Sequence, residues 1–141
     1  MSASLGAQSS DPRLVTILVV DDDPTVGPWV RAALEPVGYA ILHTIDPLEA
    51  IRVGKNRPDD IDLLLVDVVM PLMDGRKLAH RMRSLCPRMK ILLMSGYGLS
   101  DLDETGWSFI AKPFSMEQLA QQVAVTLREE ASPPVARHGR R

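Results

Sequence analysis

Apolar residues gather in five short runs along the chain, and stretches with helical spacing separate the runs. The runs cover residues 14–20, 39–43, 61–67, 90–94 and 108–111. The run from Ile61 to Asp67 is almost unbroken, which predicts a strand buried on both faces. Five strands that alternate with helices predict an α/β fold with a parallel sheet covered on both sides.

The intervening stretches have their own helix start and stop signals. The predicted helices cover residues 24–38, 46–54, 74–87 and 115–127. Asp46-Pro47-Leu48-Glu49, and Ser115 with Gln118, have the pattern of a capping box at a helix start. Leu119, Ala120, Val123, Ala124 and Leu127 form the expected buried face of the last helix. The segment 98–107 has a weak apolar stripe and predicts at most one or two helical turns.

Length and composition indicate one soluble domain. The chain has 141 residues, a net charge of −2 and a single cysteine, Cys86. We expect a flexible lead over 1–12, a globular domain over 13–130 and a disordered tail over 131–141. The charge balance does not favour direct binding of nucleic acid. The chain lacks a membrane-length apolar run and a basic, apolar leader, so we expect a cytoplasmic protein without membrane insertion.

Polar residues stand at the carboxyl ends of the predicted strands. Asp21, Asp22 and Asp23 follow the first strand, Asp67 ends the third, Ser95 follows the fourth and Lys112 the fifth. In an open parallel sheet such groups can converge in one cleft. Clustered carboxylates repel one another and favour a hard divalent cation such as Mg²⁺, while a lysine and a hydroxyl suit phosphoryl oxygens. An isolated strand-terminal Asp67 could equally cap a turn.

Four segments in register resemble the response-regulator receiver family of two-component signalling. They are Ile-Leu-Val-Val-Asp-Asp-Asp-Pro, Leu-Leu-Val-Asp-Val-Val-Met-Pro-Leu-Met-Asp-Gly, Leu-Leu-Met-Ser-Gly-Tyr and Phe-Ile-Ala-Lys-Pro-Phe. The resemblance spans about residues 14 to 130. It implies a flavodoxin-like, doubly wound fold with strand order 2-1-3-4-5. It also implies that Asp67 accepts a phosphoryl group from a histidine kinase or a histidine phosphotransfer protein, which makes the chain a phosphoprotein and not a turnover enzyme.

The resemblance also implies roles for the other site residues. Mg²⁺ would be held by Asp21, Asp22, Asp67 and the backbone carbonyl of Val69. Lys112 would pair with the phosphoryl group, and its bond to Pro113 would be cis. Ser95 would bond a phosphoryl oxygen and act as a switch with Phe109, the switch aromatic. Asp23 would neighbour the site without binding the metal.

The chain departs from the family pattern in one segment and leaves its role open. Residues 98–107 look too short for a full fourth helix, although the face of that helix, the fifth strand and the last helix usually carries the output to a downstream protein. We expect no output domain after residue 130, which leaves a shuttle and a phosphate sink both open, and the oligomeric state is open as well. Two alternatives are a haloacid-dehalogenase-like phosphatase, with Asp21 as nucleophile and Asp23 as acid, and a pseudo-receiver that binds partners without phosphorylation.

Overall fold

The computed structural model describes residues 14–96 and 106–129. In this part of the chain lie five strands: β1 (Thr16–Val20), β2 (Ala40–Thr44), β3 (Leu63–Asp67), β4 (Lys90–Ser95) and β5 (Ser108–Ala111). They form one sheet in the order β2-β1-β3-β4-β5, and every neighbouring pair is parallel. The predicted flavodoxin-like strand order is confirmed.

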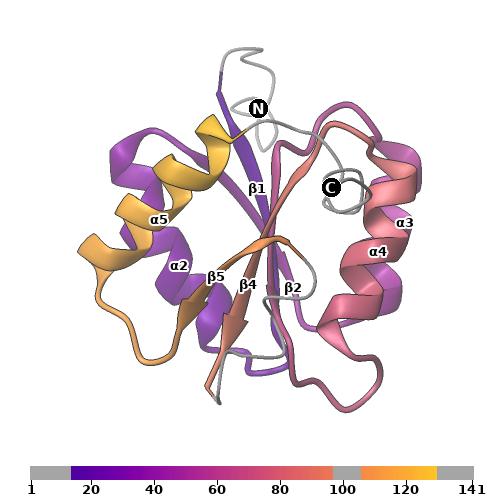
Figure 1. Cartoon of the computed structure of the whole chain (residues 1–141), viewed down its shortest axis with the longest axis horizontal. Coiled ribbons are helices and arrows are strands. Elements are labelled where there is room, and N and C mark those ends of the chain that lie inside the picture. Colours follow the sequence, from indigo (N-terminus) through magenta and orange to yellow (C-terminus); the bar gives the residue numbers. More distant parts are fainter. Residues whose placement is uncertain (1–13, 97–105, 130–141) are drawn as a thin grey trace, which may run out of the picture.

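Helices cover both faces of the sheet. They are α2 (Val26–Leu34), α3 (Pro47–Asn56), α4 (Gly75–Leu85) and α5 (Met116–Arg128), with a 3-10 turn, η1 (Glu35–Val37), after α2. Helices α2 and α5 lie on one side of the sheet, and α3 and α4 lie on the other (Figure 1). The fold is therefore doubly wound, as expected.

Strand β3 runs through the middle of the molecule and separates two hydrophobic cores. Leu64 and Val66 face the core beneath α3 and α4, whereas Leu63 and Leu65 face the core beneath α2 and α5. All residues of β3, including Asp67, are buried. The near-continuous apolar run in the sequence thus reflects burial on both faces.

One of the two predicted capping boxes is present. Ser115 and Gln118 form the full capping box of α5. At the other site Asp46 caps α3 by accepting from the Leu48 N–H.

The predicted buried face of α5 was wrong in part. Of this predicted face, Leu119 and Val123 are buried, whereas Ala120, Ala124 and Leu127 are only partly buried. Thr126, which the sequence pattern left out, is fully buried. The Thr126 hydroxyl accepts a hydrogen bond from Gln122 Nε2 at 3.3 Å, and a satisfied hydroxyl can lie in the core.

Three predictions fall largely outside the described residues. They are the lead at 1–12, the short fourth helix in 98–107 and the tail at 131–141. Among the helices that the structure describes, none combines the length and apolarity needed to cross a bilayer.

Candidate functional site

The carboxyl ends of the central strands bring three aspartates together. Asp21 directly follows β1, Asp22 comes next, and Asp67 ends β3, the strand beside β1. One carboxylate oxygen from each of these residues lies within 4.8 Å of the other two. Asp21 and Asp67 are buried and Asp22 is exposed, so the cluster opens to solvent on the Asp22 side.

Lys112 reaches across the sheet into this cluster. Its Nζ lies 3.0 Å from Asp21 Oδ2 and 3.4 Å from Asp67 Oδ2. The backbone N–H of Lys112 donates to the Ser95 carbonyl at 2.8 Å, which extends the pairing of β5 with β4 and directs the lysine toward the cleft. The peptide bond between Lys112 and Pro113 is cis, as expected.

One lysine does not balance three carboxylates. Burial and the charge of Asp21 raise the pKa of Asp67 above its usual value, although Lys112 and the Val69 N–H act in the opposite direction. Burial alone would lower the pKa of Lys112, but its contacts with Asp21 and then Asp67 outweigh burial and raise it. The cleft thus has an excess of negative charge that a cation would relieve.

The metal predicted from the sequence fits this donor set. Three carboxylates with one open side suit Mg²⁺, which takes oxygen ligands and keeps several waters. Asp21, Asp22 and Asp67 could hold the ion, and the loop residue Val69 lies two positions after Asp67 with its side chain exposed.

Asp23 lies beside the cluster and has a structural partner. Its Oδ1 accepts hydrogen bonds from the Thr25 N–H at 3.0 Å and the Thr25 hydroxyl at 2.8 Å. These two bonds lower the pKa of Asp23. The Asp23 N–H in turn donates to Asp21 Oδ1 at 2.9 Å. The turn therefore orients Asp21 through backbone geometry, while the Asp23 carboxylate holds Thr25, the residue that directly precedes α2.

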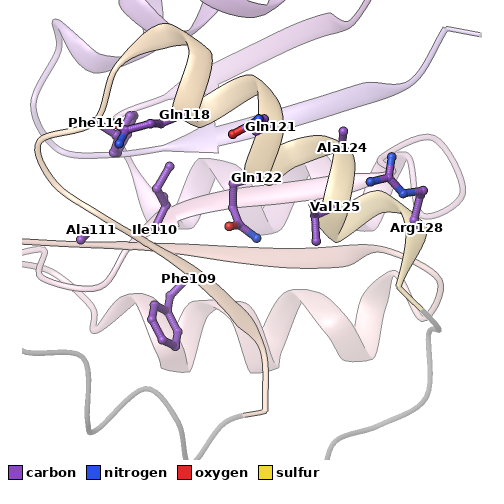
Figure 2. Close-up of a pocket in the computed structure, with 10 residues that line it drawn as sticks. All are labelled: Phe109, Ile110, Ala111, Phe114, Gln118, Gln121, Gln122, Ala124, Val125 and Arg128. Atoms are coloured by element: carbon purple, nitrogen blue, oxygen red, sulfur yellow. The ribbon is translucent and has the colours of Figure 1, made fainter.

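The two expected switch residues occupy neighbouring strands. Ser95 is buried at the end of β4, one position beyond the register partner of Asp67. Phe109 on β5 is partly buried against the core beneath α3 and α4. Figure 2 shows Phe109 and Ile110 on opposite sides of β5. Both residues line a pocket of about 560 Å³ that β5 and α5 border.

An aromatic contact next to the site was not predicted. The rings of Trp29 on α2 and Phe114 meet edge to face, with centroids 5.6 Å apart. Phe114 follows Lys112 by two residues, so this contact packs the lysine-bearing segment against α2. Phe114 is part of the Lys-Pro-Phe motif found in the sequence, but only the folded chain shows that Trp29 is its packing partner.

A family model and several named relatives match most of the chain. The family model described as response regulator receiver domain matches residues 17–124. The chain is 31% identical to the sensor kinase CckA of Brucella abortus over 82% of its own length and 13% of the relative. It is also 31% identical to the probable transcriptional regulatory protein TcrX of Mycobacterium tuberculosis, over 84% of its own length and 52% of the relative. The chain thus spans about half, or much less, of these relatives.

Solved structures agree with the sequence matches. The receiver domain of the hybrid histidine kinase CckA superposes with a TM-score of 0.71 at 33% identity, covering 80% of this chain and 99% of that one. A CheY-like receiver domain protein from Methanospirillum hungatei gives a TM-score of 0.73 at 27% identity, covering 81% and 94%.

Receiver domains accept a phosphoryl group and pass on a signal, so the family match places this chain among signalling modules and not among turnover enzymes such as the phosphatases considered above. Strand order, acidic cluster, lysine and sequence similarity agree. The chain belongs to the response regulator receiver domain family.

Proposed function

We propose that Asp67 is the phosphoacceptor and that Asp21, Asp22, Asp67 and the Val69 carbonyl hold Mg²⁺ beside it. The observation that carries this proposal is the position of Lys112, whose Nζ lies 3.0 Å from Asp21 and 3.4 Å from Asp67. Asp67 is the acid of the cluster that ends the central strand, and its pKa is raised by burial and by Asp21.

In the proposed transfer, a carboxylate oxygen of Asp67 attacks the phosphorus of a phosphohistidine. The new O–P bond forms as the N–P bond breaks, and the electron pair of that bond returns to the imidazole. Lys112 neutralises charge that builds on the phosphoryl oxygens, an electrostatic effect that a partly buried site strengthens. Mg²⁺, when bound, supplies further neutralisation of the same charge. Water later attacks phosphorus and releases inorganic phosphate, which restores the Asp67 carboxylate.

We propose that Ser95 and Phe109 report the phosphorylated state. Ser95 lies at the end of β4, where its hydroxyl could bond a phosphoryl oxygen. Phe109 lies on β5 beside the cavity that α5 borders. A change at the phosphoryl group could therefore reach a surface where a downstream protein binds.

The proposed partner is a histidine kinase or a histidine phosphotransfer protein. A relative that matches this chain over 120 residues is itself a sensor kinase, which supports a phosphohistidine donor. We further propose a receiver domain over 13–130 that works in the cytoplasm as a shuttle, a protein-binding switch or a phosphate sink. The lone Cys86, which is buried as a free thiol, suits that reducing compartment.

Intact-mass measurement after incubation with acetyl phosphate or phosphoramidate and Mg²⁺ tests the phosphoacceptor. We expect the mass of one phosphoryl group on the wild type and none on Asp67→Asn. Asp59→Asn, which changes an exposed loop acid, serves as the matched control and keeps the adduct.

Other outcomes separate the alternatives. An adduct that persists in Asp67→Asn but disappears in Asp21→Asn would move the nucleophile to Asp21 and contradict the proposal. If neither small donor nor a phosphorylated histidine phosphotransfer protein labels the folded wild type, that result would favour the pseudo-receiver alternative. The decay rate of the adduct distinguishes a long-lived switch from a short-lived sink.

A further inference from the structure

Helix α4 begins directly against the phosphoacceptor strand. Its first residue, Gly75, is buried, and the Gly75 N–H donates to the Val68 carbonyl at 2.8 Å. Asp74 caps the helix by accepting from the Arg76 N–H at 2.7 Å. The loop after Asp67 is therefore closed by the first turn of α4, which packs onto the residue next to the phosphoacceptor.

Gly75 leaves no room for a side chain. A Cβ at this position would overlap the backbone carbonyl oxygen of Asp67, and it would lie 2.8 Å from the carbonyl carbon of Asp67 and 2.9 Å from Val68 Cα. These three atoms belong to the backbone at the end of β3, and backbone in a packed core cannot swing aside as a flexible side chain can. A larger residue must displace either α4 or the peptide unit that carries Asp67.

The glycine in the neighbouring helix α3 provides a contrast. A Cβ at Gly54 would meet the terminal methyl group of Met82 at 2.9 Å, which can rotate away because methionine is flexible. The restriction at Gly75 thus comes from the phosphoacceptor backbone and is not general to the glycines of this face.

The Asp67 carboxylate is held by contacts that such a displacement would change. Its Oδ1 accepts from the Val69 N–H at 3.3 Å, and its Oδ2 lies 3.4 Å from Lys112 Nζ. Val69 is also the residue whose carbonyl we expect to face the metal. Moving the peptide between Asp67 and Val68 would shift both oxygens relative to the lysine and to the other acids.

We propose that Gly75 is a positioning residue for phosphoryl transfer, because its missing side chain lets α4 hold the Asp67 carboxylate in line with Lys112 and the acidic cluster. This inference rests on the proposed role of Asp67. It does not make Gly75 a catalytic residue, since the glycine acts through the backbone of its neighbour.

The test compares three variants of the full chain. Gly75→Ala carries the change, Gly54→Ala is the matched glycine control, and Leu78→Ala removes a fully buried side chain of the same helix. Urea unfolding gives the stability of each variant. Initial phosphorylation rates with acetyl phosphate are then measured over a range of donor and Mg²⁺ concentrations, at a temperature where circular dichroism shows the proteins folded.

We expect Gly75→Ala to be phosphorylated about 10- to 100-fold more slowly than the wild type, since a displacement near 1 Å can have this effect. The loss should fall on the maximal rate more than on the donor concentration for half-maximal rate. Gly54→Ala and Leu78→Ala should keep the wild-type rate although Leu78→Ala is less stable. The amide NMR shifts of Val68, Val69 and Lys112 should change in Gly75→Ala alone.

Three results would overturn the inference: a wild-type rate in Gly75→Ala, an equal slowing in Leu78→Ala, or a Gly75→Ala chain that fails to fold where Leu78→Ala folds. The last result would show that the glycine serves the stability of the fold. Each differs from failure of the proposed function, which would appear as a wild type without an adduct or an Asp67→Asn variant that keeps one.

Discussion

Strand β3 has an aspartate at each end, and the two have different surroundings. Asp62 directly precedes the strand and is exposed; its Oδ2 accepts from the Thr16 N–H at 2.8 Å, and its own backbone groups pair with Thr16 and Lys90. Asp67 ends the strand, is buried, and shares Lys112 with a second buried carboxylate, Asp21.

The difference between the two aspartates shows which end of the sheet can bind a cation. At the amino end, the Asp62 carboxylate meets a neutral donor and water, so a bound cation would gain little there. At the carboxyl end, carboxylates outnumber the lysine and burial raises the pKa of Asp67. Unbalanced negative charge that the fold holds in place favours binding of a cation, and a cation together with Lys112 can then balance the charge of a phosphoryl group.

The largest expected effect is on the phosphorylation rate, and it should appear at Lys112 but not at Lys90, which lies at the opposite end of the sheet. Lys112→Ala removes the cation of the cleft, and we expect phosphorylation from acetyl phosphate to slow by about 100-fold, in the range seen when an electrostatic stabiliser is lost. Lys90→Ala removes a 3.5 Å contact from Nζ to the Leu127 carbonyl, and it should leave the rate unchanged. Labelling followed by intact mass checks both variants, and equal rates in the two would contradict the comparison.

Stabilisation by Mg²⁺ should likewise depend on one end of β3 only. At about a hundredfold excess of Mg²⁺ over its Kd, binding to the folded state should add about 2.7 kcal/mol to the free energy of unfolding. Asp67→Asn and Asp22→Asn should lose most of this gain, because each lacks a ligand of the cluster. Urea unfolding with and without Mg²⁺ measures it, and Asp62→Ala should retain the full gain.

Asp62→Ala should instead weaken the fold itself. The Thr16 N–H would lose its carboxylate acceptor, and we expect the free energy of unfolding to fall by about 1 kcal/mol. The phosphorylation rate should stay at the wild-type value. Urea unfolding combined with the labelling assay checks this prediction, which a slowed rate at unchanged stability would refute.

The smallest effect concerns Asp74, an acid of the carboxyl end that is fully partnered, as Asp62 is. Hydrogen bonds from Arg76 lower the pKa of Asp74 below 3.8, its ordinary value. The charge of Asp74 therefore stabilises the fold at any pH above 3.8, and this contribution disappears as the pH falls through the lowered pKa. Asp74→Asn keeps the cap and should cost about 0.5 kcal/mol at pH 7. Urea unfolding at decreasing pH should show the difference shrinking toward zero.

Local patterns in the sequence were sufficient to predict most elements, because strand burial and helix capping depend on near neighbours. Residues 61–67 predicted the central strand, and Ser115 with Gln118 predicted the start of α5. The buried Thr126 was missed because its hydroxyl is satisfied by Gln122 within the helix, which an apolar-stripe pattern does not register. The roles of Asp21, Asp67 and Lys112 came from family resemblance and from their places at strand ends.

The sequence by itself determined the alternation of strands and helices, the acids that follow β1 and β3, and the lysine that follows β5. Only the tertiary structure decided that Lys112 lies closer to Asp21 than to Asp67, that Trp29 packs on Phe114, and that α4 needs a glycine against the Asp67 carbonyl. The physical reason is sequence separation. Spacing along one element is set by local geometry, whereas distances between residues far apart in the chain depend on how the packed layers fit together.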